Sequence, residues 1–307
     1  NVRKYQFEMG NRKPINNTIK LNANLKPEIK TSYEVGVDMK FLDNRLGFDF
    51  TYYYNTTKNQ AMLVDASSPW TQQWVNAGKI NNTGVEFMLY GTPVKTRDFQ
   101  FDITANLAHN SSTVKELADG VNRVYFAGDS NMPVKVGAVK GGKLGDIFAN
   151  NLMQRDAQGR VIIGADGLPM AATGDGNLEQ YLLDHPIGNI QPDLLMSITP
   201  TFTYKGISLT AMFDMKFGGD IVSVSEGMAT SVGTSERTAY RGEYKTVNGV
   251  QDWYMVVPGV KADGSVNTQE VSAQKYYSTI GLYSSQKGYA EEFVHDASYI
   301  KLKELSL

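Results

Sequence analysis

The sequence predicts an all-β chain that forms part of a large antiparallel transmembrane β-barrel, with about seven strands, short turns at one end and long loops at the other. Three observations lead to this fold class. Apolar and polar residues alternate along several segments, short and long connections alternate strictly between those segments, and aromatic residues gather near the segment ends.

The first hairpin, residues 25–60, shows the alternation most clearly. Its first strand has one apolar and one polar face. The apolar face is Tyr33, Val35, Val37, Met39 and Phe41, and the polar face is Ser32, Glu34, Gly36, Asp38 and Lys40. After a turn at residues 42–45, a second strand repeats the pattern. Here Leu46, Phe48, Phe50, Tyr52 and Tyr54 alternate with Gly47, Asp49, Thr51 and Tyr53. Alternation with a period of two predicts two paired, amphipathic strands.

The same design recurs along the chain. Further strands are expected at residues 85–90, 99–108, 196–204 and 207–214, and a seventh from Ser298 onward. Because proline cannot donate to the ladder, Pro93 is expected to end its strand and Pro200 to produce a bulge.

The connections between these strands alternate in length. Short turns are expected at residues 42–45, 95–98 and 205–206, and long connections at residues 58–78, 110–191 and 217–296, the last with a helical piece near 223–229. An up-and-down membrane barrel has this arrangement, because every strand crosses the bilayer and then reverses.

A soluble protein remains an alternative, because a half-buried sheet also alternates. A secreted glycan-binding or adhesive β protein would bury four apolar residues against a second sheet. They are Phe48, Phe50, Ile103 and Leu209. A barrel enzyme is another alternative. It would need a nucleophile and a base at the loop end, for which His185 or His295 is the candidate base.

Composition excludes several other classes. The 307 residues carry a formal charge of −2, spread along the chain, so no basic surface for nucleic acid is expected. There is no cysteine, which removes disulfides and thiolate metal sites. No apolar run reaches the roughly 18 to 20 residues of a transmembrane helix.

Several motifs, in this order, resemble the later barrel portion of SusC/RagA-like TonB-dependent outer-membrane transporters. They are LKPE at 25–28, TSYEVGVD at 31–38, NRL at 44–46, DFTYY at 49–53, NAG at 76–78, TGVE at 83–86, GKLGDI at 142–147, IGN at 187–189, PD at 192–193, FGG at 217–219 and DASYIKLKEL at 296–305. The resemblance covers essentially the whole chain.

This resemblance implies a multi-pass barrel of 22 strands in the bacterial outer membrane, with short turns in the periplasm and long loops outside. It implies a plug domain, a TonB complex as energy source, a SusD-like surface lipoprotein as partner, and import of a large glycan or peptide. Residues 1–307 are then expected to be a fragment of the barrel domain, with the plug and closing strands outside the chain. Neither a cofactor nor an enzymatic activity is expected.

Two sets of residues are candidates for binding. The first faces the barrel lumen, where polar residues contact solute or plug, and comprises Glu34, Asp38, Asp49, Asp102 and Asp214. The second is aromatic and lies in the loops, for contact with ligand or lid, and comprises Trp70, Trp74, Tyr125, Trp253 and Tyr254. No metal site is expected. Asp156, Asp166 and Asp175 resemble loosely spaced calcium ligands, but turn chemistry explains them as well.

Overall fold

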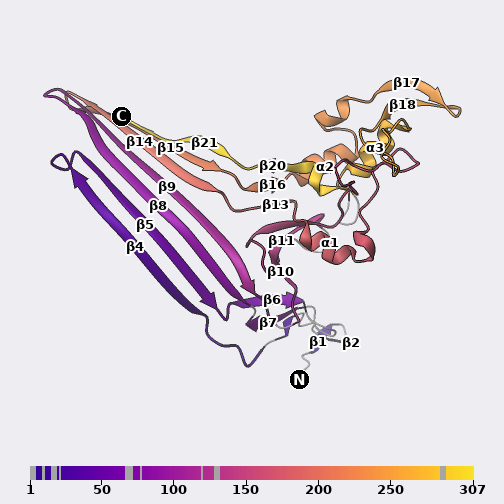
Figure 1. The fold of residues 1–307 in the computed structure, drawn as a ribbon, viewed down its shortest axis with the longest axis horizontal. Coiled ribbons are helices and arrows are strands. Elements are labelled where there is room, and N and C mark those ends of the chain that lie inside the picture. The colour runs from indigo at the N-terminus through magenta and orange to yellow at the C-terminus, as the bar shows by residue number, and fades with distance from the viewer. Residues whose placement is uncertain are drawn as a thin grey trace.

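The computed structural model describes residues 5–8, 11–14, 19–20, 22–65, 72–76, 78–118, 120–127, 132–283 and 288–307. Its largest element is a seven-stranded antiparallel sheet, the wall sheet, in the order β21-β15-β14-β9-β8-β5-β4. Its strands are β4 (Ile29–Phe41), β5 (Leu46–Lys58), β8 (Lys79–Lys95), β9 (Phe99–Glu116), β14 (Leu194–Tyr204), β15 (Ile207–Phe217) and β21 (Tyr299–Ser306). Strands that follow one another in this set are neighbours in the sheet, so the predicted meander of seven strands is confirmed (Figure 1).

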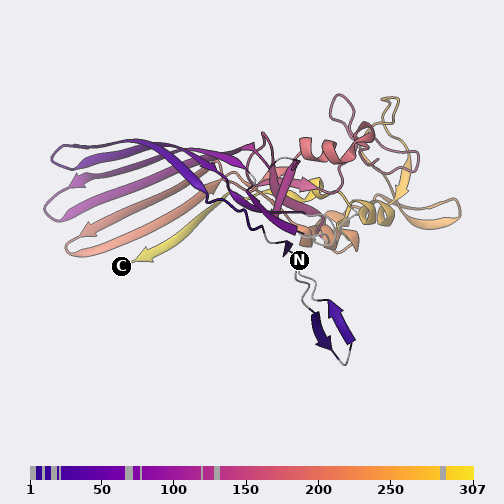
Figure 2. The ribbon, with the colours of Figure 1, turned by 90° about the horizontal axis from the view of Figure 1, so that it is seen from below.

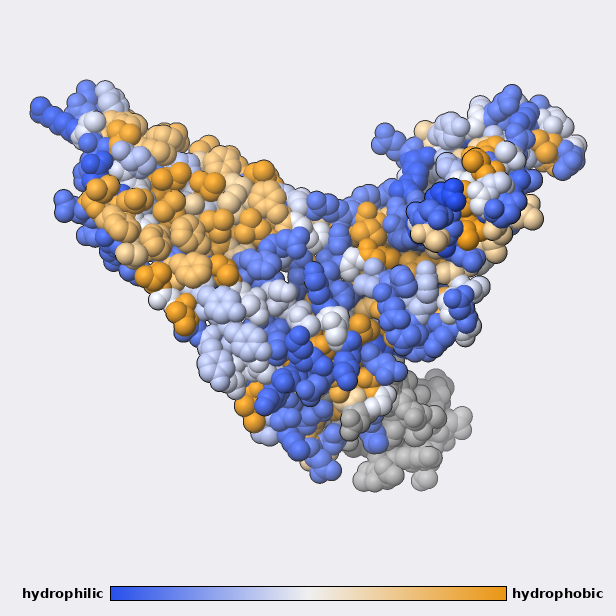
Figure 3. Space-filling view, viewed as in Figure 1, coloured by the Kyte–Doolittle hydropathy of each residue, from blue (hydrophilic) through white to orange (hydrophobic). Residues whose placement is uncertain are grey.

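Cross-strand register places most apolar residues of the seven strands on one face. One row crosses the whole sheet, because each of its members pairs with the next. It runs through Val37, Phe50, Phe87, Leu107, Met196, Met215 and Ile300. This apolar face forms a continuous band between polar turn tips and the polar loop end (Figure 3). No other part of the described chain covers this band at its edge, where Val35 on β4 is 73% exposed.

Aromatic rings pack together within this band near the short turns. Phe41 stacks on Phe48 with ring centroids 6.1 Å apart, and Phe48 contacts Phe87 at 6.0 Å. On the neighbouring hairpins, Phe101 stacks on Phe202 at 4.7 Å. The predicted concentration of aromatic residues by the short turns therefore forms direct ring contacts across strands.

Strands β8 and β9 are longer at the loop end than the alternation predicts. Most of their added residues are polar, and several join neighbouring strands through side-chain hydrogen bonds. Asn81 donates to the Tyr54 hydroxyl at 2.6 Å, and Ser112 donates to Asn82 at 2.5 Å. Because these segments are not amphipathic, hydrophobic periodicity could not predict them as strands.

The expectations for the two prolines are wrong. Strand β8 continues past Pro93 to Lys95, and the register shift near Pro93, between Gly91 and Val94, accommodates the missing donor. Around Pro200 the register of β14 is unchanged against both neighbours, so no bulge forms there. In the ladder with β15, residues 199–200 have no partners. The missing proline donor is therefore accommodated by a gap in the ladder rather than by an inserted residue.

The long connections contain most of the remaining elements. The connection after β5 contributes β6 (Ala61–Asp65) and β7 (Gln72–Asn76), which form a small sheet with β3 (Ile19–Lys20); β1 (Tyr5–Glu8) and β2 (Asn11–Pro14) form a separate hairpin. The connection after β9 carries β10 (Arg123–Ala127), β11 (Val134–Val139), β12 (Asp146–Ala149), η1 (Gly174–Gly176), α1 (Leu178–Asp184) and β13 (Gly188–Asn189). The connection after β15 carries β16 (Asp220–Val222), α2 (Val224–Ser231), η2 (Glu236–Ala239), β17 (Glu243–Val247), β18 (Val250–Val256), β19 (Glu270–Ser272), α3 (Ala273–Ile280), η3 (Ala290–Phe293) and β20 (Val294–Asp296).

These last two connections fold together into one module, the head, formed by the described residues of 120–193 and 218–297 (Figures 1 and 2). Two apolar clusters join them. In one, Met153 and Ile163 of the first connection pack with Val257 and Tyr277 of the second. In the other, Leu152 packs near Phe293, which is fully buried. The predicted helical piece near 223–229 is present as α2, whereas α1 and α3 were not predicted. None of the helices in the described part of the chain is long and apolar enough to cross a membrane.

Candidate functional site

The polar face of the wall sheet carries a second continuous row, directly beside the central apolar row but on the opposite face. Strand pairing links its members one to the next across all seven strands. They are Asp38, Asp49, Met88, Asn106, Ser197, Asp214 and Lys301. Three of the five acidic residues predicted for the lumen therefore lie in one row. Strands are about 4.8 Å apart, so the carboxyl groups of Asp49 and Asp214, four strands apart, are roughly 20 Å from each other.

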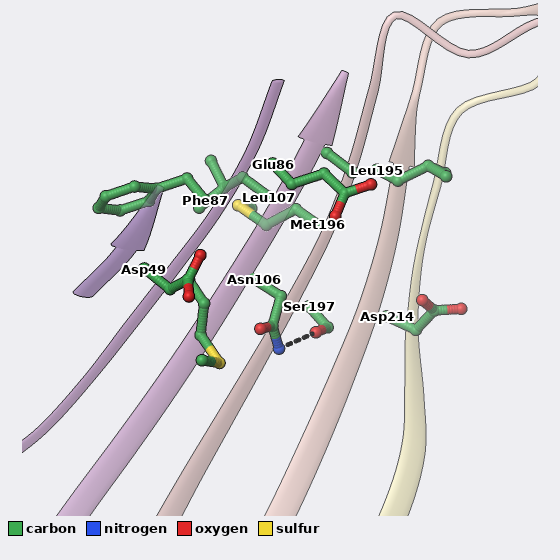
Figure 4. Close-up of a pocket in the computed structure, with 11 residues that line it drawn as sticks. Asp49, Glu86, Phe87, Asn106, Leu107, Leu195, Met196, Ser197 and Asp214 are labelled. Atoms are coloured by element: carbon green, nitrogen blue, oxygen red, sulfur yellow. Dashed lines mark hydrogen bonds between the residues drawn. The ribbon is translucent and has the colours of Figure 1, made fainter. Parts of the chain in front are cut away.

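The centre of this row lies in an open hollow of about 440 Å³ (Figure 4). Asp49, Glu86 and Asp214 supply its carboxylates. Between them, Asn106 donates to the Ser197 hydroxyl at 3.1 Å. The hollow thus presents acceptor oxygens at both ends and amide and hydroxyl groups in the middle. Such a surface can bind polar solutes or cationic groups through several dispersed contacts.

Asp38 and Asp49 lie directly opposite each other on β4 and β5. Like charges in this position destabilise an antiparallel pair. Two neighbours reduce the repulsion: the Lys40 ammonium is 3.6 Å from the Asp38 carboxylate, and the Thr51 hydroxyl donates to Asp49 at 3.4 Å. The pair is not required by strand formation, which makes it a candidate for interaction with a ligand or another polypeptide.

Asp102 and Glu34 lie outside the hollow. Asp102 is near the short turns, where it accepts hydrogen bonds from Thr92 at 2.7 Å and from the Gln100 amide at 2.8 Å. Its carboxylate is thus held by structural contacts. Glu34 lies toward the loop end, opposite Tyr53 on β5. The five predicted acidic residues therefore share one face but do not form one site.

Glu86, Asn106 and Ser197 were not among the predicted site residues. Each is the polar member of an alternating pair, so its face could be predicted from the sequence. Its place beside Asp49 and Asp214 depends on the registers of four different strand pairs, which the sequence alone does not fix.

The loop aromatics lie in separate parts of the structure. Trp74 is on β7, and Tyr125 is on β10, with the Lys135 ammonium 4.9 Å from its ring centroid. Trp253 and Tyr254 are on β18, where Trp253 contacts the Tyr244 ring at 5.3 Å. Trp70 lies outside the described residues. Of these residues, Trp253 lines a hollow in the head.

Two of the acidic loop residues, Asp156 and Asp166, have structural partners. Asp156 forms an ion pair with Arg160 at 2.7 Å. Desolvation raises the pKa of Asp156, but hydrogen bonds from Arg160 and Gln158 together leave it below its usual value. Asp166 accepts the Leu168 amide at 3.2 Å, and Asp175 lies within η1. Among the described residues, no three acidic or histidine side chains are placed to hold a metal ion.

The two candidate catalytic bases also have partners. His185 stacks on Tyr181, and its Nδ1 is 2.8 Å from the Tyr181 carbonyl oxygen. The Nε2 atom of His295 is 2.6 Å from the Glu226 carboxylate. The hollow beside His185 is lined by an Arg155–Glu291 ion pair and apolar groups, with no hydroxyl nucleophile except the Tyr181 phenol.

Comparisons with known proteins agree with this architecture. Residues 5–147 match the family described as TonB dependent receptor-like, beta-barrel. The chain is 27% identical over 234 residues to the TonB-dependent receptor SusC of Bacteroides thetaiotaomicron, covering 71% of this chain and 22% of SusC. It is 26% identical over 217 residues to the TonB-dependent receptor P3 of Formosa agariphila, covering 66% of this chain and 22% of P3. The chain thus aligns with about a fifth of these relatives.

The fold is shared with a solved transporter structure. Superposition on a chain of the RagAB peptide transporter gives a TM-score of 0.62 with 18% sequence identity, over 99% of this chain and 31% of that one. The same transporter in its closed-closed state gives 0.63. Together with the amphipathic wall sheet, these matches make the chain similar to part of the β-barrel of SusC/RagA-like TonB-dependent receptors of the bacterial outer membrane.

Proposed function

We propose that this chain is a wall segment of an active importer, which carries a nutrient too large for porins across the outer membrane with energy delivered by TonB. The observation that carries the proposal is the strict separation of the two faces of the wall sheet. The apolar row meets lipid, and the row through Asp49, Asn106 and Asp214 lines the lumen. The five inner strands pair with a neighbour on both sides, which is how a lipid environment requires backbone hydrogen bonds to be satisfied.

The remainder of the importer belongs to a longer polypeptide in this proposal. The outer edges of β4 and β21 are where further barrel strands continue the wall, and a plug domain fills the lumen. The head and the long connection after β5 then lie outside the cell, where a SusD-like lipoprotein covers them. The cargo in this proposal is a large glycan or peptide, and the matching solved structure is described as a peptide transporter.

A soluble β protein is not supported by the packing. Its four diagnostic residues would be buried against a second sheet. Instead Phe50 is 37% and Leu209 40% exposed, and neither Phe48 nor Ile103 is buried. An enzymatic role lacks a comparable basis, because the contacts of His185 and His295 are a carbonyl oxygen and a carboxylate rather than an aligned nucleophile.

Growth experiments test the import proposal. A strain without the complete receptor should fail to grow on at least one member of a panel of large glycans and peptides, and the wild-type gene should restore growth. Deleting TonB should abolish the same growth. Restored growth without TonB would contradict active import.

The lumen hollow is tested in the same strain. The triple variant Asp49→Asn, Glu86→Gln, Asp214→Asn should slow uptake while its amount at the cell surface stays unchanged, because it removes charge without changing shape. The matched control is Thr210→Ala, which lies on the same face nearer the short turns and contacts Thr201 at 3.0 Å. Equal uptake by the triple variant and the control would remove the hollow from the transport route.

A further inference from the structure

Charged residues occur at one place only on the apolar face of β4, β5 and β8. Register assigns to this face every second residue of each strand, in rows parallel to the one through Val37, Phe50 and Phe87. Within these fully described strands, the only charged residues in the rows are Lys58 and Lys79, at the loop end. We propose that these two residues, the lysine pair, bind the phosphate group of a lipid in the outer leaflet. The proposal rests on the orientation of the wall, with its loop end outside the cell, and not on import.

The two lysines lie directly opposite each other on neighbouring strands. Lys58 is the last residue of β5, Lys79 is the first of β8, and strand pairing makes them partners. The Cβ atoms of such partners are about 4.5–5.5 Å apart, so both ammonium groups can reach a single anion. Like charges in this position destabilise a sheet. Strand formation therefore does not account for the pair, and an anion bound between the two ammonium groups would relieve their repulsion.

The protein supplies little negative charge to the lysine pair. Among the described residues, no carboxylate lies within ion-pair distance of the Lys58 ammonium, and this side chain is exposed. The Lys79 ammonium is 3.8 Å from the Glu116 carboxylate, and the two side chains are 34% and 63% exposed. An ion pair so open to solvent contributes little. Lys115, which precedes Glu116 in the chain, is also exposed. The site therefore keeps a net positive charge.

The distance along the strands places the lysine pair at the level of lipid head groups. On this side the apolar band ends at Tyr33, Tyr52 and Tyr54, and tyrosine is typical of the boundary of a membrane barrel. Lys58 follows Tyr54 by four residues, which is about 13 Å along the strand and about 10 Å along the membrane normal at a tilt of about 40°. The head-group layer extends roughly 5–7 Å beyond the hydrocarbon. Because a lysine side chain is long and flexible, both ammonium groups can reach back into this layer.

The surface between the tyrosines and the lysine pair is polar (Figure 3). One row of it crosses four strands through Thr31, Thr56, Asn81 and Thr113. Asn81 donates to the Tyr54 hydroxyl at 2.6 Å and accepts from the Thr56 hydroxyl at 3.2 Å. A soluble anion would contact the lysines alone, whereas a lipid would also contact these hydroxyl and amide groups and the apolar band. The continuity of the three layers favours a lipid as the source of the phosphate.

Lipid binding by the complete receptor, purified in detergent, tests the proposal. The probe is monophosphoryl lipid A, its fully dephosphorylated form is the matched lipid control, and native mass spectrometry measures the bound fraction of each. The phosphorylated lipid should bind, and it should bind more weakly as the salt concentration rises, because exposed charges are screened. The dephosphorylated lipid should bind about tenfold more weakly or less. Inorganic phosphate should displace no more lipid than sodium chloride of the same ionic strength.

Variants of the lysine pair identify the site. Lys58→Gln combined with Lys79→Gln should weaken binding of the phosphorylated lipid by about tenfold or more, as expected for two lysines near an anionic lipid surface. Lys58→Arg combined with Lys79→Arg should retain the binding, because guanidinium groups also bind phosphate. The matched control removes two lysines from the polar face, Lys30→Gln with Lys216→Gln, and it should bind as the wild type does.

Thermal unfolding in detergent separates lipid binding from a structural role. Without lipid, the double glutamine variant should melt at the wild-type temperature or above it, because the repulsion between the lysines is gone. Monophosphoryl lipid A should raise the melting temperature of the wild type but not that of the variant. Growth on the imported nutrient tests import independently, so either proposal can fail without the other. Equal binding of the two lipid forms, equal affinity of the wild type and the double glutamine variant, or specific displacement of the lipid by inorganic phosphate would overturn the proposal.

Discussion

Asp296 ties the head to the wall sheet where the chain enters β21. Its carboxylate accepts hydrogen bonds from the Ser298 amide at 2.8 Å and the Ser298 hydroxyl at 2.5 Å. The same hydroxyl oxygen accepts the Gly218 amide, at the end of β15, at 2.8 Å. Two hydrogen bonds from Ser298 lower the pKa of Asp296 below its usual value, and the one from the side chain has the larger effect. One carboxylate therefore orders both strands at their exit from the sheet.

This network should open in acid. Because the pKa of Asp296 is lower in the folded state, its contribution to stability is fully present above the unfolded pKa of about 3.9 and is lost as the pH falls through the folded value. Amide hydrogen exchange at Ser298 and Gly218, corrected for intrinsic rates, should lose protection below about pH 4. In Asp296→Asn the protection should be weaker and independent of pH over this range. A pH-independent wild type would contradict the role of the carboxylate.

On the polar face of the wall sheet, two strands use glycine to seat an aromatic ring from the neighbouring strand. Gly84 on β8 lies opposite Tyr53 on β5, and Gly47 on β5 lies opposite Tyr90 on β8. A Cβ atom at Gly84 would lie 2.2 Å from the Tyr53 hydroxyl and 2.8 Å from the carbonyl oxygen of His109. The Tyr53 hydroxyl meanwhile donates to Asn110 at 3.1 Å. The ring thus covers the glycine and links three strands.

Replacing this glycine should disturb the sheet. In Gly84→Ala the added methyl group displaces the Tyr53 ring and presses on the β9 backbone, so we expect a loss of about 1–3 kcal/mol in the free energy of unfolding, as for other overpacked sites. Urea titration of the receptor in detergent measures it. Gly91→Ala on the same strand is the control, because its nearest contact would be 3.4 Å away and ordinary. Equal midpoints for the two variants would show that Tyr53 moves freely.

Across the whole molecule, the sequence predicts the wall sheet better than the head. Alternation specifies which face of each strand is apolar, so Phe50 and Asp49 could be assigned to opposite faces without coordinates. The head depends instead on contacts between distant segments, such as the Met153 amide and the Glu291 carboxylate, 138 residues apart at 2.6 Å. Such pairs leave no periodic signal. The lumen hollow is intermediate, because the faces of its residues follow from alternation but their adjacency follows from register.

The assignment of the two faces makes one prediction for the molecule as a whole. Phe50 and Thr51 are consecutive in the middle of β5 but belong to opposite faces, with Phe87 and Glu86 as their respective partners on β8. An arginine near the middle of a lipid-facing strand costs about 2–4 kcal/mol, whereas a lumen position remains hydrated. Phe50→Arg should therefore destabilise the receptor folded in lipid vesicles by about this amount, and Thr51→Arg should have little effect. Urea unfolding in vesicles measures both variants under the same conditions. A larger loss of stability for Thr51→Arg than for Phe50→Arg would mean that the acidic face of the sheet meets the lipid. The assignment of the lipid face and the lumen face would then be reversed.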